Sequence, residues 1–152
     1  MPLPNVYEPQ VVQQLAQRLH ALQPNTTPLW GSMSVSQMLA HCNVTYDMVY
    51  TTKYKAPNAF TKLILKAFVK KMVTNEVPYK KNGQTAPQFL IKSPKDFEQE
   101  KQTLLGHIHK TAELGQAHFE GKESISFGVL QATQWNNMFY KHLDHHLRQF
   151  GV

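Results

Sequence analysis

Four stretches of this sequence repeat apolar residues every three or four positions, and this spacing is the feature that most restricts the fold. Side chains return to the same face of an α-helix at those intervals, so each stretch predicts a helix with one apolar face. The stretches lie at about residues 9–22, 34–51, 94–112 and 133–150. No segment shows a convincing alternation of apolar and polar residues, which a half-buried strand would need. We therefore expect an all-α fold, a four-helix bundle.

Several predicted helix ends carry recognisable signals. Pro9 suits the first turn of the first helix, where a missing N–H costs nothing. Ser34 followed three positions later by Gln37 has the form of a capping box at the start of the second helix. Ser93 can cap the third helix, with Pro94 at its first position.

A long irregular connection separates the second and third main helices. Its first part predicts a short amphipathic helix, formed by Phe60, Leu63, Ile64, Phe68 and Met72. Prolines and an Asn-Gly pair then interrupt the chain up to about residue 92. A connection of this length in a small protein is typical of a functional or flexible segment.

The length of 152 residues predicts a single domain, residues 1–152, with a core that needs no disulfide. Cys42 is the only cysteine, which favours a reducing compartment, and no secretory signal is evident. We therefore expect a cytoplasmic protein. Lysines interrupt the longest apolar stretch, residues 60–73, so we expect no membrane span.

The net charge is +6, and lysines are concentrated in the middle third of the chain. They are Lys53, Lys55, Lys62, Lys66, Lys70, Lys71, Lys80 and Lys81. One interpretation is a solvated helix face and loop, and the other is a site that attracts an anionic ligand or membrane headgroups. We expect no nucleic-acid partner.

The last predicted helix carries two histidines on its apolar side. Residues advance about 100° per position around an α-helix, so His142 and His146 lie only about 40° apart. Asp144 points away, and His145 lies toward the edge. The apolar side is marked by Trp135, Phe139, Leu143 and Phe150. Two imidazoles one turn apart on such a face have the spacing that two ligands of one metal ion need.

A third histidine, His41, lies at the edge of the apolar side of the second predicted helix. A bundle can bring this helix beside the last one. Neutral imidazole is the commonest metal ligand, and three protein ligands leave positions open, as in catalytic sites. The alternative is a set of core histidines with ordinary hydrogen-bond partners. We expect a divalent metal site on His41, His142 and His146.

The remaining histidines and the cysteine have simpler interpretations. We expect ordinary solvated side chains at His20, His107, His109 and His118. His145 has two interpretations: a group that supports the metal site, such as a proton shuttle, or an edge residue with no role. Cys42 is expected to pack in the core.

Two blocks of sequence resemble a bacterial branch of the DinB/YfiT-like superfamily, whose members are regarded as metalloenzymes. Residues 29–42 read Leu-Trp-Gly-Ser-Met-Ser-Val-Ser-Gln-Met-Leu-Ala-His-Cys, and residues 141–151 read Lys-His-Leu-Asp-His-His-Leu-Arg-Gln-Phe-Gly. That superfamily has one histidine on its second helix and His-x-x-x-His on its last. The resemblance implies a DinB/YfiT-like four-helix bundle and the ligands His41, His142 and His146. The superfamily's Arg-Gly-Gln ending is Leu-Arg-Gln here.

The resemblance also implies a class of chemistry. Such relatives bind zinc, nickel, iron or manganese, and many use a low-molecular-weight thiol as cosubstrate. The resemblance therefore implies a metal-dependent thiol S-transferase or hydrolase that acts on a small-molecule substrate. Dimers are common among similar proteins. Tyr46, Trp135 or the lysine-rich segment would then line the pocket. The alternatives are a non-catalytic module that keeps the metal to hold a ligand, and an interaction protein that uses its basic middle.

Overall fold

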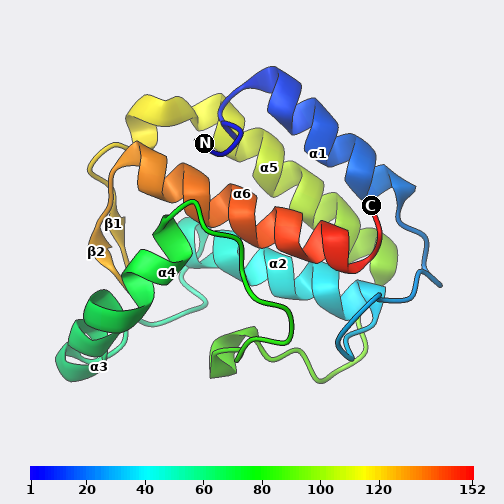
Figure 1. The fold of residues 1–152 in the computed structure, drawn as a ribbon, viewed down its shortest axis with the longest axis horizontal. Helices are drawn as coiled ribbons and strands as arrows, with labels where there is room; N and C mark the ends of the chain where they lie inside the picture. The colour runs from blue at the N-terminus through cyan, green and yellow to red at the C-terminus, as the bar shows by residue number, and fades with distance from the viewer.

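The computed structural model describes residues 1–152 and is predominantly helical, which confirms the all-α prediction (Figure 1). The elements in chain order are α1 (Pro9–Ala21), α2 (Val35–Tyr50), α3 (Ala59–Ile64), a π-helical segment η1 (Leu65–Val69), α4 (Lys70–Thr74), a 3-10 turn η2 (Pro87–Phe89), α5 (Phe97–Phe119), β1 (Glu123–Ser124), β2 (Gly128–Val129) and α6 (Ala132–Gln149). None of these helices is long and apolar enough to cross a membrane.

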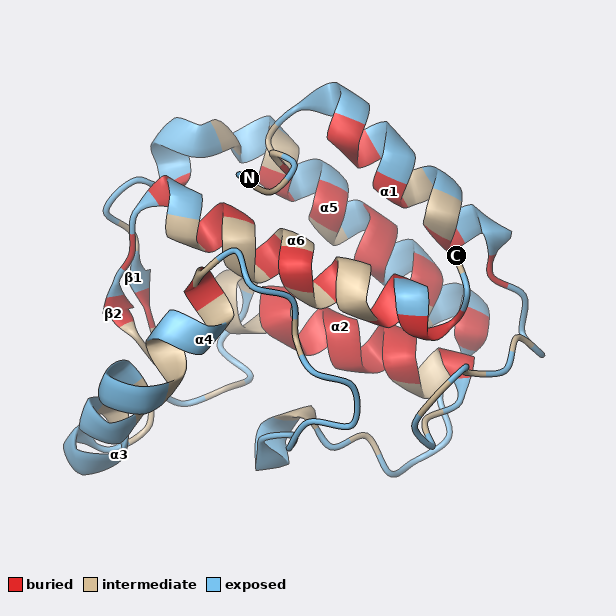
Figure 2. Ribbon diagram, in the orientation of Figure 1, coloured by how far each residue is buried: buried red, intermediate tan, exposed pale blue.

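The four long helices α1, α2, α5 and α6 form the bundle. Helix α5 packs against the other three, and α2 also packs against α6. Each contributes a leucine with no exposed surface to one connected apolar core, and Figure 2 shows the buried residues on the inward faces. These leucines are Leu19, Leu39, Leu104 and Leu147. Burying one such side chain stabilises the fold by about 1.5–3 kcal/mol.

The start of α2 is as predicted and the start of α5 is not. Ser34 Oγ accepts a hydrogen bond from the backbone N–H of Gln37 at 3.2 Å, and the Gln37 side chain accepts from the N–H of Ser34 at 3.0 Å. Helix α5 was expected to begin at Pro94 with Ser93 as cap. It begins at Phe97 instead, because Asp96 accepts from the N–H of Gln99 at 2.7 Å. A carboxylate there also interacts favourably with the helix dipole.

A kink within α5 and a hairpin after it have no counterpart in the predicted helices. Gly115 interrupts α5 with a φ of 74°, so the helix kinks there before it ends at Phe119. A small antiparallel hairpin follows, in which Glu123 pairs with Val129 and Ser124 with Gly128. The hairpin is too short for an alternating pattern to have indicated it.

The connection between α2 and α5 lies along the outside of the bundle. Helix α3 and segment η1 extend away from the bundle, α4 packs against α6, and residues 75–92 then cross α6 (Figure 1). Lys141 on α6 holds the end of α4: its Nζ donates to the carbonyls of Met72 and Asn75 at 2.6 and 2.7 Å. These carbonyls would otherwise lack partners at the helix end.

Candidate metal centre

The structure brings His41 on α2 together with His142 and His146 on α6. The Nε2 atoms of His41 and His142 lie 3.0 Å apart. The ring centroid of His146 lies 4.5 Å from that of His41 and 4.9 Å from that of His142. One ligand nitrogen from each of the three residues falls within 4.8 Å of the others. His41 and His146 are buried, and His142 is partly exposed.

The outward-facing Nδ1 atom of each ring has its own partner. His41 Nδ1 lies 2.9 Å from the carbonyl oxygen of Phe89, and His146 Nδ1 lies 2.8 Å from Oε1 of Gln149. Both partners accept hydrogen bonds, so both Nδ1 atoms carry the proton and both Nε2 atoms present a lone pair. His142 Nδ1 lies 3.1 Å from the hydroxyl of Thr45, which can donate or accept.

This arrangement fits a divalent ion. If Thr45 accepts from His142, imidazole lone pairs of the three residues lie close together, and a cation between them would relieve their mutual repulsion. Without a cation, His142 can turn to the other tautomer and donate its proton to His41. Nitrogens about 2.1 Å from a tetrahedral ion lie about 3.4 Å from one another. The Nε2 atoms of His41 and His142, 3.0 Å apart, are near this separation, and the separations of up to 4.8 Å in the set would shorten by movement of one side chain.

Burial also keeps the three imidazoles in the neutral form that a metal needs. Burial lowers the pKa of His41, and lowers the pKa of His142 well below its usual value, with the neighbouring histidines adding to the shift. Burial, reinforced by His41, lowers the pKa of His146 to about 3. The three rings are therefore unprotonated at neutral pH.

Aromatic rings from distant segments surround the histidines. Phe89 lies with its ring centroid 5.3 Å from that of His41, and Tyr79 lies 6.5 Å from His142. Both belong to the long connection, which therefore covers the site from the outside of the bundle. Sequence reasoning missed both, because nothing in an irregular segment shows where it packs. Gln149 and Thr45 were also missed, although each lies one helical turn beyond a predicted ligand.

His145 lies beside the cluster and outside the ligand set. Its ring centroid is 5.1 Å from that of His146, and its ring also meets Tyr79 at 5.7 Å and Trp30 at 5.8 Å. The side chain is partly buried, and burial lowers its pKa. The position is compatible with either interpretation of this residue, the supporting role or the edge position.

Other sequence-predicted residues lie elsewhere. Trp135 stacks on Phe139, and Tyr46 stacks between Phe139 and His107, so both aromatic residues belong to the core instead of lining the histidine site. Cys42 is buried as expected, and burial raises the pKa of its thiol.

The expectation of a solvated His107 was wrong. Its ring packs between those of Tyr46 and Tyr50, with Nε2 3.5 Å from a carboxylate oxygen of Asp47. The helical repeat places His107 on the α5 face that packs against α2, although its polar character had indicated the surface. The other three, His20, His109 and His118, are exposed as predicted.

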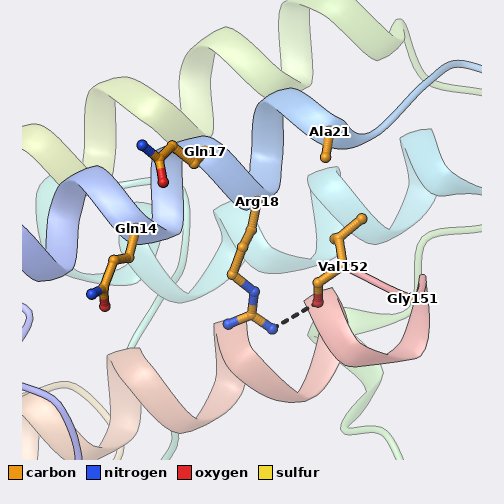
Figure 3. A pocket seen from close by; sticks show the side chains of 6 residues that line it. All are labelled: Gln14, Gln17, Arg18, Ala21, Gly151 and Val152. Carbon is orange, nitrogen blue, oxygen red and sulfur yellow. Dashed lines mark hydrogen bonds between the residues drawn. The ribbon is translucent and has the colours of Figure 1, made fainter.

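A hollow of about 650 Å³ lies between α1 and the end of the chain, and it does not include the histidines (Figure 3). Arg18 carries the only charged side chain in its lining, and its guanidinium is already engaged. It donates to Asp144 and to the Val152 oxygen, each at 2.8 Å. The hollow therefore offers no free charge for a ligand, and the histidine cluster remains the candidate site.

A comparison with known protein families identifies the family of this chain. The profile of the family described as "Protein of unknown function (DUF1569)" matches residues 9–151, nearly the whole chain and all three histidines. The chain belongs to this family. No curated protein and no solved structure matched the chain. In this DUF1569 protein, the buried cluster of three histidines is compatible with a metal site.

Proposed function

We propose that this DUF1569 protein is a metal-dependent enzyme related to the DinB/YfiT-like superfamily. His41, His142 and His146 would hold one divalent ion, and the enzyme would act on a small molecule as a thiol S-transferase or hydrolase in the cytoplasm. Residues 1–152 would form one domain, since a single connected core draws on all four bundle helices.

The observation that carries the proposal is the shared orientation of three imidazoles. The Nε2 atoms of His41 and His142 lie 3.0 Å apart, and one nitrogen of each of the three rings lies within 4.8 Å of the others. Each Nδ1 atom has a polar partner: Phe89, Thr45 or Gln149. Such partners are typical of metal-binding histidines, because they fix the tautomer and the ring orientation. An all-imidazole set suits zinc, iron or nickel, whereas manganese favours oxygen ligands.

A bound ion would lower the pKa of a coordinated water or thiol and so supply a nucleophile at neutral pH. The protein's own residues would do the rest. Phe89 and Tyr79 would limit the access of water, and Gln149 and Thr45 would keep the ligand rings oriented. His145, beside the cluster, would receive or return a proton at a ring nitrogen.

Metal analysis of protein purified without an affinity tag tests the metal site. We expect about one ion per chain, which His142→Ala removes while the helical circular dichroism signal is retained. His145→Ala is the matched control, since it removes a neighbouring imidazole that is outside the ligand set. The ligand assignment would be wrong if His142→Ala kept its ion, or if His145→Ala lost it.

Turnover separates the enzyme from the alternative, a non-catalytic module that keeps the metal to hold a ligand. The metal-loaded protein would be incubated with small electrophiles and bacillithiol, mycothiol or glutathione, and separately with hydrolysable esters and amides. The enzyme proposal expects turnover that His142→Ala abolishes and His145→Ala reduces by about 100-fold or more. Metal binding without any turnover would favour the binding module.

A further inference from the structure

The helical segment of residues 59–74, made of α3, η1 and α4, exposes its apolar side. Phe60 and Phe68 keep 72% and 77% of their surface exposed, and Leu63 keeps 64%. Ile64 and Met72 are also exposed, and together these five residues follow the three- and four-residue steps of one helical stripe. Figure 2 shows this segment extending from the bundle with its surface mostly exposed. A stripe of large apolar residues in water marks an interaction surface.

The polar side of the same segment is basic. Residues 59–74 contain Lys62, Lys66, Lys70 and Lys71 and no acidic residue. Lys62 pairs with Glu123 at 3.0 Å, and Lys70 donates to the carbonyl of Val129 at 3.2 Å, so the inner side of the segment is tied to the β-hairpin. Lys66 and Lys71 are exposed. The Lys66 side chain lies against Gly128 of the hairpin, but neither Lys66 nor Lys71 has an ion-pair partner. The apolar stripe is therefore held outward, and the segment keeps unneutralised positive charge.

We propose that this segment docks the protein on the surface of an anionic lipid bilayer. Phenylalanine and leucine on one side with lysines on the other are typical of helices that lie in the membrane interface. The 16 residues from Ala59 to Thr74 form a helix about 24 Å long. This length suits a helix lying flat, and the charges of Lys66, Lys70 and Lys71, which have no acidic partner, would attract acidic headgroups. The inference is independent of the metal site.

Charge favours a bilayer over a second copy of the chain as the occupant. A two-fold interface would place this lysine-rich segment against the same segment of its partner. The positive charges of the two copies would then lie close together around the contact, and their repulsion opposes association. An anionic bilayer offers the opposite charge and an apolar layer together, and so matches both sides of the helix.

Co-sedimentation of the full chain with lipid vesicles tests the proposal. We expect binding to vesicles of phosphatidylcholine mixed with phosphatidylserine, weaker binding to phosphatidylcholine alone, and release at high salt. Lys66→Gln and Lys71→Gln should each weaken the partition by about fivefold. Matched controls are Lys92→Gln and Lys95→Gln, which remove exposed lysines outside the segment and should have little effect.

The apolar stripe is tested by the double variant Phe60→Ser and Phe68→Ser. Both side chains are exposed, so the fold should be unaffected, and we expect a loss of vesicle binding of about 100-fold or more. Leu114→Ser, on α5, is the control. The proposal fails if the wild-type chain does not bind anionic vesicles at low salt. It also fails if the chain self-associates in solution and the double variant abolishes that association.

Discussion

The side chain of Gln149 accepts a hydrogen bond from Nδ1 of His146 at 2.8 Å, one turn further along α6. Its amide Nε2 donates to the backbone carbonyl of Trp30 at 2.7 Å. The segment that precedes α2 therefore holds Gln149, and Gln149 orients His146. Through the hydrogen bond between Gln149 and Trp30, the two sequence blocks that resemble the DinB/YfiT-like superfamily contact each other directly beside the candidate metal centre.

Removing the acceptor of Gln149 should weaken metal binding. In Gln149→Leu, the Nδ1–H of His146 loses its partner, and we expect metal affinity to fall by about 10–100-fold. Competition against a chromogenic chelator measures this change. Gln149→Glu is the comparison, because its carboxylate can still accept from His146 although it loses the N–H that donates to Trp30. We expect it to lose less affinity than Gln149→Leu does. Equal losses in both variants would contradict an orienting role.

A substitution at Gly31 also tests the role of Gln149, because the Gln149 side chain lies against the backbone of Gly31. Its φ is 81°, and an added Cβ would lie 2.6 Å from Nε2 of Gln149. Gly31→Ala should therefore displace Gln149 and reduce metal affinity, in addition to a backbone cost of about 1–3 kcal/mol.

Gly115→Ala provides the control for Gly31→Ala. Its φ is 74°, but an added Cβ would meet nothing within 4 Å. Urea unfolding should show similar losses of stability in the two variants, and chelator competition should show lower affinity only in Gly31→Ala. If Gly115→Ala weakened metal binding equally, the effect would come from stability and not from Gln149.

The helices and the two candidate ligand histidines of α6 could be predicted from the sequence because both depend on local periodicity. The spacing of His142 and His146 on one face of a helix is fixed by helical geometry alone. His107 was misjudged because its burial depends on which face of α5 packs against Tyr46 and Tyr50, a tertiary relationship. Phe89 and Tyr79 reach the site through an irregular segment, whose path no periodicity determines.

The buried position of His107 predicts a dependence of stability on pH. Burial lowers the pKa of His107, although Asp47 opposes the shift. The folded state therefore binds this proton less readily than the unfolded state, whose histidine pKa is about 6.5. The contribution of this pKa shift to the free energy of unfolding is fully present above about pH 6.5 and is lost as the pH falls below that value.

The measurement is the free energy of unfolding in urea, with a chelator present, between about pH 7 and pH 5. The site histidines shift in the same direction, so the total slope is steep in the wild type. His107→Gln should have a shallower slope, and His109→Gln, at an exposed position, is the control. An unchanged slope in His107→Gln would show that this imidazole is free to protonate in the folded protein.

Lys141 should determine how firmly the long connection covers the histidines. Its Nζ donates to Met72, to the Asn75 carbonyl and to Asn75 Oδ1 at 2.6–2.8 Å, and it lies 4.8 Å from the ring centroid of Tyr79. In Lys141→Met those oxygens lose their donor, which should cost about 1–3 kcal/mol. Amide hydrogen exchange should then become faster in residues 75–92, which carry Tyr79 and Phe89, with little change in α1.

Lys70→Met is the comparison, because Lys70 makes one hydrogen bond of 3.2 Å to a carbonyl at the hairpin. It should change exchange in residues 75–92 much less than Lys141→Met does. Since Phe89 supplies the carbonyl that holds His41, loosening this segment should also lower metal affinity in Lys141→Met. Unchanged exchange together with unchanged affinity would mean that the cover over the histidines is held by its aromatic contacts and not by this ammonium group.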